Sequence, residues 1–163
     1  MRFLGKLEMT RLIAILFLLV SVVGFADATF LTVEHYRGVV PPCSVVQGCE
    51  RVTTSKFSTV ASIPISLPGA VYYLVLASAA LFFLDTKRQN ALRYGAYLTF
   101  AGFGISLILA FIQLFILHAI CLYCMFSAIT STILLILGIL FLKSSTMGFA
   151  EHIAENSNIL SDE

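Results

Sequence analysis

The stretch HAICLYCMFSAITSTILLILGILFLK, residues 118–143, has two cysteines in C-x-x-C spacing near its start and continues as an apolar run. The run from Tyr123 to Leu142 has the length of about 20 mostly apolar residues that a helix needs to cross a bilayer. Backbone polar groups in lipid must pair within their own segment, which requires a helix. The stretch therefore predicts a membrane-spanning helix with Cys121 and Cys124 at its start.

Three further segments have the same character, and they are Leu12 to about Val33, Leu67 to Leu84, and about Tyr94 to Leu117. The whole chain of 163 residues is 59% hydrophobic and 12% charged, with a mean hydropathy of +0.96. A soluble domain usually carries about 25% charged residues. The predicted fold class is an all-α integral membrane protein, a bundle of four transmembrane helices. The formal net charge of +1 argues against nucleic-acid binding.

The distribution of basic residues predicts the orientation. Seven of the 10 Lys and Arg lie before span one, between spans two and three, or after span four: Arg2, Lys6, Arg11, Lys87, Arg88, Arg93 and Lys143. The positive-inside rule then puts residues 1–11 and the tail 143–163 in the cytoplasm, flanking a membrane domain over 12–142. The loop of about 34–66 and the Cys121 end of span four face outside. A signal peptide cleaved near Ala26-Asp27-Ala28 is the alternative for span one, although apolar residues resume beyond that site.

All four cysteines fall on the outer side in this topology. Cys43 and Cys49 lie in the long loop, separated by five residues, and Cys121 and Cys124 form the C-x-x-C. Inert cysteines would be scattered through the apolar spans, and the outer side is where disulfides persist. Three interpretations remain open: two structural disulfides, a four-thiolate zinc site, or two redox couples.

Spacing and placement favour the redox couples. A C-x-x-C closes a very small loop and so stabilises little, and the five-residue gap is wider than zinc ligand pairs usually have. A cysteine at a helix N-terminus is favoured as the thiolate, which is the species that attacks disulfides. One pair lies in an aqueous loop that a soluble protein can reach. The other lies at the bilayer edge, where a lipid-soluble carrier can meet it.

With these pieces in this order, the sequence resembles the vitamin K epoxide reductase family, most closely its prokaryotic members. The motifs are Cys43-x5-Cys49, Ser55 six residues further on, Pro64-Ile65-Ser66-Leu67-Pro68-Gly69 at the entry of span two, and Cys121-Leu122-Tyr123-Cys124. The resemblance covers roughly Thr10 to Leu142.

The resemblance implies a thiol-disulfide oxidoreductase with a quinone of the ubiquinone, menaquinone or vitamin K type and no metal. Cys124 would face the quinone, Cys121 would exchange with Cys49, and Cys43 would exchange with a separate thioredoxin-like (DsbA-like) protein outside the membrane. Ser55 would hydrogen-bond near the quinone or the reacting sulfur. Electrons would flow toward the quinone and support disulfide formation in exported proteins, although the direction depends on reduction potentials.

The resemblance also implies a quinone pocket lined by Phe57, Ile65, Tyr72, Gln113, Leu117 and Ala128. Ala128 and Ile65 stand where animal enzymes have a Tyr and an Asn that contact the quinone oxygens, which argues against carrying over epoxide reduction. Gln113 is polar within span three, so it is expected either to bond another helix or to bond a quinone carbonyl. Asp27 is a functional candidate if it lies inside the hydrocarbon.

Two rival functions are kept. A DsbB-type quinone reductase of another family would carry the C-x-x-C in its first outer loop, which is the reverse of the order found here. A four-cysteine metal-binding or structural membrane protein would bind zinc in place of exchanging electrons.

Overall fold

The structure is a computed structural model. It describes the backbone of residues 2–39, 48–55, 58–60 and 63–161, and the side chains of 8–39, 48–55, 58–59 and 63–144. Cys43 and Phe57, two of the predicted site residues, lie outside the described residues.

Four helices are long and apolar enough to cross a membrane in the part of the chain that is described. They are α1 (Arg2–Arg37), α3 (Ser66–Thr86), α4 (Gln89–Phe111) with a π-helical extension η1 (Ile112–Ile116), and α5 (Leu122–Ser161). The apolar portion of α5 ends near Ser144. This confirms the prediction of a helical multi-pass membrane protein with four spans.

Two left-handed backbone positions end helices at the turns. Gly38, with φ of +67°, follows α1, and its N–H donates to the carbonyl of His35 at 3.1 Å. Lys87, with φ of +56°, caps α3 and donates its N–H to Phe83 at 2.8 Å. A left-handed residue directly after a helix satisfies carbonyls of the last turn while turning the chain away. The turn at Lys87 lets α4 run back beside α3.

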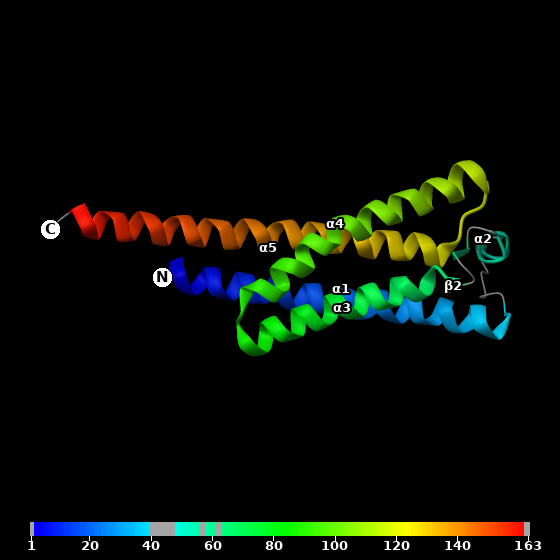
Figure 1. Ribbon diagram of the computed structural model, residues 1–163, viewed down its shortest axis with the longest axis horizontal. Helices are drawn as coiled ribbons and strands as arrows, with labels where there is room; N and C mark the ends of the chain where they lie inside the picture. Colours follow the sequence, from blue (N-terminus) through cyan, green and yellow to red (C-terminus); the bar gives the residue numbers. More distant parts are fainter. Residues whose placement is uncertain (1, 40–47, 56–57, 61–62, 162–163) are drawn as a thin grey trace.

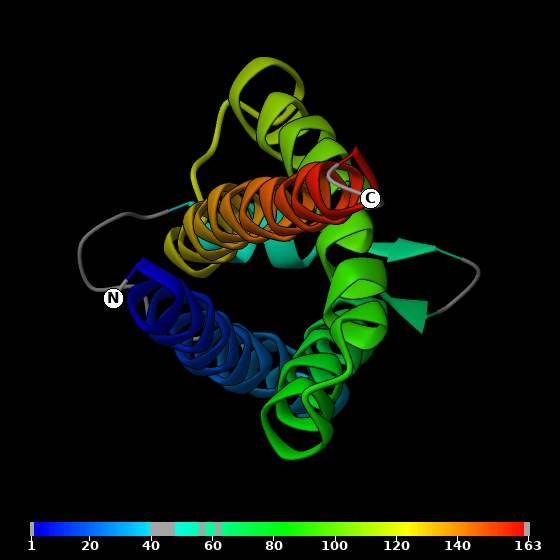
Figure 2. The same cartoon turned by 90° about the vertical axis from the view of Figure 1, so that its left-hand side faces the viewer.

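The helices form an elongated bundle in which α1 packs against both α3 and α5, and α4 packs against α5 and α3. Figure 1 shows α1, α3 and α5 running lengthwise while α4 crosses them at an angle. Figure 2, looking along the bundle, shows the helices surrounding a common centre. Large side chains fill the core between them and are fully or almost fully buried: Phe17, Leu76, Leu92, Leu134 and Phe141.

The outward faces of the bundle are apolar as well. Many large hydrophobic side chains are exposed along all four spans, for example Leu19, Val71, Ile105 and Ile136. Such a surface suits lipid and would be unstable in water.

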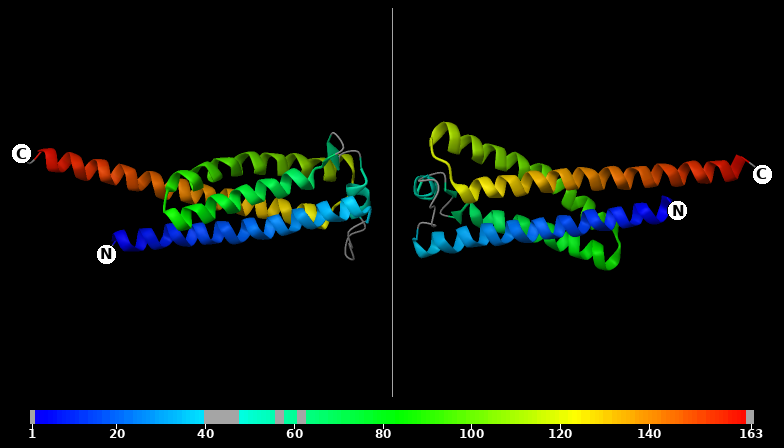
Figure 3. Two further views of the ribbon diagram at one scale, coloured as in Figure 1. Left: turned by 60° about the horizontal axis from the view of Figure 1, so that its bottom comes forward. Right: turned by 180° about the vertical axis from the view of Figure 1, so that it is seen from behind.

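The described part of the segment between α1 and α3 lies at one end of the bundle. It holds a short helix, α2 (Cys49–Thr53), and a two-stranded antiparallel hairpin, β1 (Thr59–Val60) with β2 (Ile63–Pro64). Figure 3 shows this segment at the end of the molecule opposite both termini.

Several helices extend beyond the predicted spans, and α1 already begins at Arg2 and α4 at Gln89. Helix α1 continues to Arg37 beyond the predicted end near Val33, so the connecting segment starts at Gly38. Helix α5 continues to Ser161, well past the predicted end at Leu142. Apolar length predicts the membrane-embedded part of a helix, whereas helical hydrogen bonds can continue into the polar flank.

Candidate functional site

The C-x-x-C pair stands at the first turn of α5. Cys121 directly precedes the helix, and its carbonyl accepts the N–H of Met125 at 3.0 Å, so it occupies the N-cap position. Cys124 lies one turn further and is partly buried. Cys121 is 0% exposed, and both are free thiols. The predicted placement at a helix start is therefore what the structure has.

Hydrogen bonds at this turn favour the Cys121 thiolate. The pKa of Cys121 falls from 9.0 to about 7, chiefly because the Cys124 thiol hydrogen-bonds to its sulfur. The backbone N–H groups of Cys124 and Tyr123 act in the same direction. Burial and the negative charge of Asp27 oppose the shift without cancelling it. Unpaired N–H groups at a helix N-terminus stabilise an anion in this way.

Gln113 holds Cys121 from the end of α4. Its side chain is 4% exposed, and its Oε1 accepts the backbone N–H of Cys121 at 3.0 Å. Its own backbone carbonyl accepts the N–H of Ala119 at 3.1 Å. Gln113 lies in the π-helical turn η1, where the wider winding changes the direction of side chains relative to a regular helix. The structure shows the structural bond expected for Gln113, and its bond to a quinone carbonyl stays a prediction.

Cys49 is packed against the same turn. It is 1% exposed and belongs to one buried cluster with Val52, Ala119 and Cys121. The backbone of Gly48 lies so close to Ile120 that a Cβ at Gly48 would collide with the Ile120 backbone. Cys49 is disulfide-bonded. The expectation that Cys49 sits in an open aqueous loop is therefore wrong, because α2 buries it beside Cys121.

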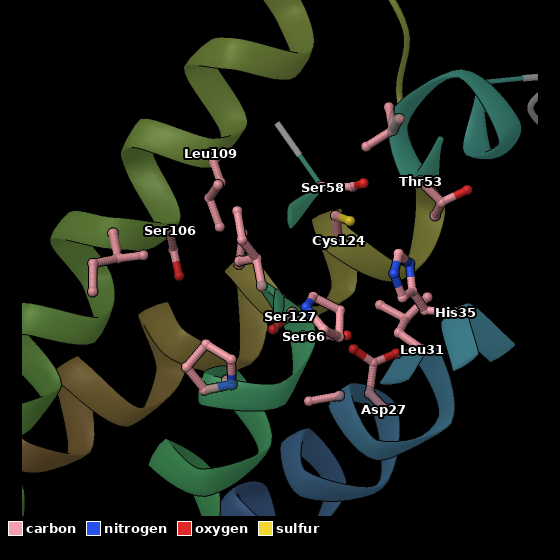
Figure 4. Close-up of a pocket in the computed structure, with 18 of the residues that line it drawn as sticks. Asp27, Leu31, His35, Thr53, Ser58, Ser66, Ser106, Leu109, Cys124 and Ser127 are labelled. Carbon is pink, nitrogen blue, oxygen red and sulfur yellow. The ribbon is translucent and has the colours of Figure 1, made fainter. Parts of the chain in front are cut away.

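A cavity of about 710 Å³ opens on the other side of Cys124. Its walls come from α1, α3, the α4–η1 helix, α5 and the described part of the segment between α1 and α3. Figure 4 shows Cys124 and Ser127 of α5 directed toward this space, with Ser58 and Thr53 above and Asp27, Leu31 and His35 from α1 alongside. Cys121 is not among the lining residues. The two thiols therefore have different surroundings. Cys121 is buried in the cluster with Cys49, whereas Cys124 packs against the edge of that cluster and also lines the cavity.

Most residues predicted for the quinone pocket line this one cavity. They are Ile65, Tyr72, Gln113, Leu117 and Ala128, and they are joined by Ser55. The Ser55 hydroxyl donates to the carbonyl of Val52 at 2.8 Å, which leaves its oxygen available as an acceptor. Segments far apart in sequence thus contribute to a single space beside Cys124.

Several polar lining residues were not predicted for the pocket, among them Asp27, His35, Ser66, Tyr73, Ser106 and Ser127. The Tyr73 hydroxyl lies 2.9 Å from both the carbonyl and the hydroxyl oxygen of Ser127, and 3.0 Å from Thr130 Oγ1. This network joins α3 to α5 next to Cys124. Gly24 on α1 leaves room for the Tyr73 ring, because a Cβ there would meet it. In the sequence, the only indications that these residues line a pocket were the ionisable Asp27 and the hydroxyl-bearing Tyr73 inside apolar runs.

A metal site requires several donor side chains close together. Among the described residues, no three His, Cys, Asp or Glu side chains gather as ligands. Cys49 carries a disulfide, so its sulfur is not available as a thiolate ligand in this state. The donors described here do not form a zinc site.

Comparison with known proteins gives one match. The sequence model described as the Vitamin K epoxide reductase family matches residues 15–139, which is most of the chain and includes all four cysteines. A search of curated proteins found no match. The family is one of oxidoreductases that are associated with quinones and disulfide bond formation and that generally work with thioredoxin-like partners.

Proposed function

Because this chain belongs to the vitamin K epoxide reductase family, we propose that it transfers electrons from an external dithiol protein to a membrane quinone. The observation that carries the proposal is the different surroundings of the two C-x-x-C thiols. Cys121 lies in one buried cluster with Cys49, while Cys124 lines a cavity between the membrane helices. A thiol pair placed in this way can receive electrons on one side and release them on the other.

The cavity residues fit a quinone as the electron acceptor. Small-molecule sites are commonly about 300–1,000 Å³, mostly apolar, with a few polar groups that fix orientation. The volume of about 710 Å³ falls in that range. Apolar side chains such as Leu31, Ile65, Leu109 and Leu117 supply the walls, and Ser55 offers an acceptor oxygen. When bound, the quinone supplies the two-electron, two-proton acceptor.

Two thiol–disulfide exchanges among the four cysteines can carry the electrons within the chain. The Cys49 thiolate attacks Cys121 Sγ, which breaks the Cys121–Cys124 disulfide and releases Cys124 as a thiolate. A thiolate at Cys43, the proposed partner of Cys49, then attacks Cys49 Sγ and releases Cys121. Two electrons have then moved from the loop pair to the C-x-x-C. The lowered pKa of Cys121 makes it a good leaving group in the second step.

The redox state of the structure is consistent with this sequence of steps. Cys49 is disulfide-bonded while Cys121 and Cys124 are free thiols. That is the distribution expected after the C-x-x-C has received electrons and before it has passed them on.

The proposed orientation puts α2 and the C-x-x-C outside the cytoplasm. Both termini lie at the opposite end of the bundle (Figure 3), and seven of the 10 Lys and Arg belong to that end by sequence. Short basic flanks face the cytoplasm. The external electron donor is then a separate thioredoxin-like protein that meets Cys43.

A reconstituted assay tests this function. Purified protein in lipid nanodiscs is mixed with a reduced thioredoxin-like protein and a short-chain ubiquinone, and loss of quinone absorbance is followed. We expect turnover by the wild type and none by Cys124→Ala. Ile129→Ala, a lipid-facing change on the same helix, should retain it. Turnover by Cys124→Ala would contradict the role of Cys124.

Trapping the intermediate distinguishes the relay from the alternatives. In Cys43→Ala/Cys124→Ala protein, Cys49 and Cys121 have no other partner and should form a mixed disulfide that peptide mapping detects. Measuring the zinc content of the wild type by elemental analysis tests the metal-binding alternative. Stoichiometric zinc together with four protected thiols would exclude the relay, and so would absence of the mixed disulfide under every oxidising condition.

A further inference from the structure

Helix α1 presents a row of side chains to the cavity beside Cys124. Asp27, Leu31 and His35 follow one another at intervals of four residues, which places them on one face of the helix. All three line the cavity, and Figure 4 shows them in sequence from Asp27 toward His35 at the end nearer α2. Asp27 lies within the apolar span Glu8–Arg37.

Among the described residues, Asp27 has no partner that would explain it as a structural residue. Its Oδ2 atom is buried and has no hydrogen-bond partner in that part of the chain. A polar group buried without a partner is unfavourable, and an ionisable residue inside a membrane span marks a functional position. Glu34, on the same helix, provides the contrast. Its carboxylate lies 3.9 Å from Arg37 and does not line the cavity.

The titratable groups that line the cavity together with Asp27 can take part in redox and proton-transfer chemistry. The lining residues that the structure gives include no Lys or Arg. The titratable side chains among them are His35 on α1, Tyr72 and Tyr73 on α3, and Cys124 on α5. The charge of Asp27 also acts on both Cys121 and Cys124. The Asp27 carboxyl and the Cys124 thiol therefore share one cavity, in which a proton can pass between them.

We propose that Asp27 carries a proton from the Cys124 thiol to the carbonyl oxygen of the quinone. This rests on the proposed function. As the Cys121–Cys124 disulfide forms, Asp27 Oδ2 takes the proton from Cys124, so an S–H bond breaks. Asp27 then gives the proton to the oxygen that becomes a hydroxyl, and its carboxylate is restored. Cys121 releases its own proton to water before the disulfide closes, and the second oxygen takes a proton from water at the His35 end. Two electrons and two protons thus convert quinone to hydroquinone.

The test compares Asp27→Asn with Asp27→Glu, which keeps the carboxyl, and with Glu34→Gln as the matched control. Quinone reduction is measured with a short-chain ubiquinone across pH. General acid–base groups contribute about 10²–10⁴-fold, so we expect Asp27→Asn to lose at least about 100-fold. Asp27→Glu should recover part of the rate, and Glu34→Gln should match the wild type.

A second readout needs no quinone. In protein with Cys43, Cys49 and Cys121 replaced by Ser, the pH at which Cys124 is half-alkylated is measured. Asp27→Asn should shift this pH, whereas Glu34→Gln should leave it unchanged. Quinone binding, followed as a ligand-dependent rise in Tm, should persist in Asp27→Asn.

Three outcomes would overturn the role of Asp27. They are a wild-type rate for Asp27→Asn at every pH, an unchanged alkylation profile, or loss of quinone binding in parallel with rate. Each leaves the proposed function standing, because the wild type still reduces quinone. Failure of the wild type itself would instead contradict the proposed function.

Discussion

Gln113 Oε1 accepts the backbone N–H of Cys121 at 3.0 Å, and both residues are buried. The N–H of Cys121 lies just before α5, where no helical carbonyl is available to pair with it. One side chain on η1 therefore fixes the backbone of the cysteine that lies beside Cys49. This bond links the geometry of the thiol relay to the end of α4.

Replacing Gln113 with Leu should destabilise the protein and slow its turnover. Leaving a buried N–H without its acceptor costs about 1–3 kcal/mol. Unfolding titrations in mild detergent measure the loss, and the quinone assay measures the rate. Leu114→Ala is the control, because Leu114 belongs to the same π-helical turn but is exposed to lipid. Equal stability of the Gln113→Leu and Leu114→Ala proteins would contradict the role of this bond.

The lowered pKa of Cys121 predicts how its thiolate titrates. In protein with Cys43 and Cys49 replaced by Ser, the ultraviolet absorbance of the thiolate should rise around pH 7, well below the ordinary value of 9.0. The shift is downward, so ionisation of Cys121 favours the folded state. This contribution is fully present above the unfolded pKa and is lost as pH falls through about 7.

The cause of this shift is tested at Cys124. In the same background, Cys124→Ala removes the donor to the Cys121 sulfur, so the titration should move to higher pH. Cys124→Ser keeps a hydroxyl that can donate and should move it less. If both variants kept the midpoint of the parent protein, the helix N-terminus alone would set the pKa of Cys121.

The four spans and the place of the C-x-x-C were predictable because they depend on local properties. About 20 apolar residues predict a spanning helix whatever surrounds it. The position of Cys121 directly before an apolar run likewise predicts a helix N-terminus. The cavity residues Ile65, Tyr72, Leu117 and Ala128 were predicted through the family resemblance, and the structure places all four at one cavity.

The features that the sequence did not predict depend on tertiary contacts. The burial of Cys49 follows from the packing of α2 against residues about seventy positions away, which no local pattern encodes. The π-helical turn that directs Gln113 toward Cys121 has no sequence signature. Asp27 was visible as an ionisable residue in an apolar run, but its position in the cavity depends on where α3 and α5 pack.

Tyr73→Phe should weaken the joint between α3 and α5. The Tyr73 hydroxyl lies within 3.0 Å of Ser127 and Thr130 oxygens on α5 and is buried. Interhelical hydrogen bonds in membranes average about 0.6 kcal/mol, so losing this network should cost about 1–2 kcal/mol. Tyr97→Phe, at an exposed tyrosine on α4, is the control in the same detergent titration. No difference between the two would show that the network adds nothing to stability.

Gly48→Ala should separate the two redox pairs. A Cβ at Gly48 would collide with the backbone of Ile120, so α2 must move away from the turn that carries Cys121. Misplacing reacting groups by about 1 Å can cost about 100-fold in rate. We therefore expect slow turnover with a thioredoxin-like donor. Turnover should be near normal with a small membrane-permeant dithiol that reduces the Cys121–Cys124 disulfide directly.

Gly104→Ala is the matched control for this change. A Cβ at Gly104 meets no atom of the described residues within 4 Å, so the substitution adds the same methyl group without displacing any of them. It should leave both assays at the wild-type rate. If Gly48→Ala slowed both electron donors equally, the defect would lie in the cavity or the fold. Loss with the protein donor alone would place it at the contact between Cys49 and Cys121, where the relay requires α2 to stay packed.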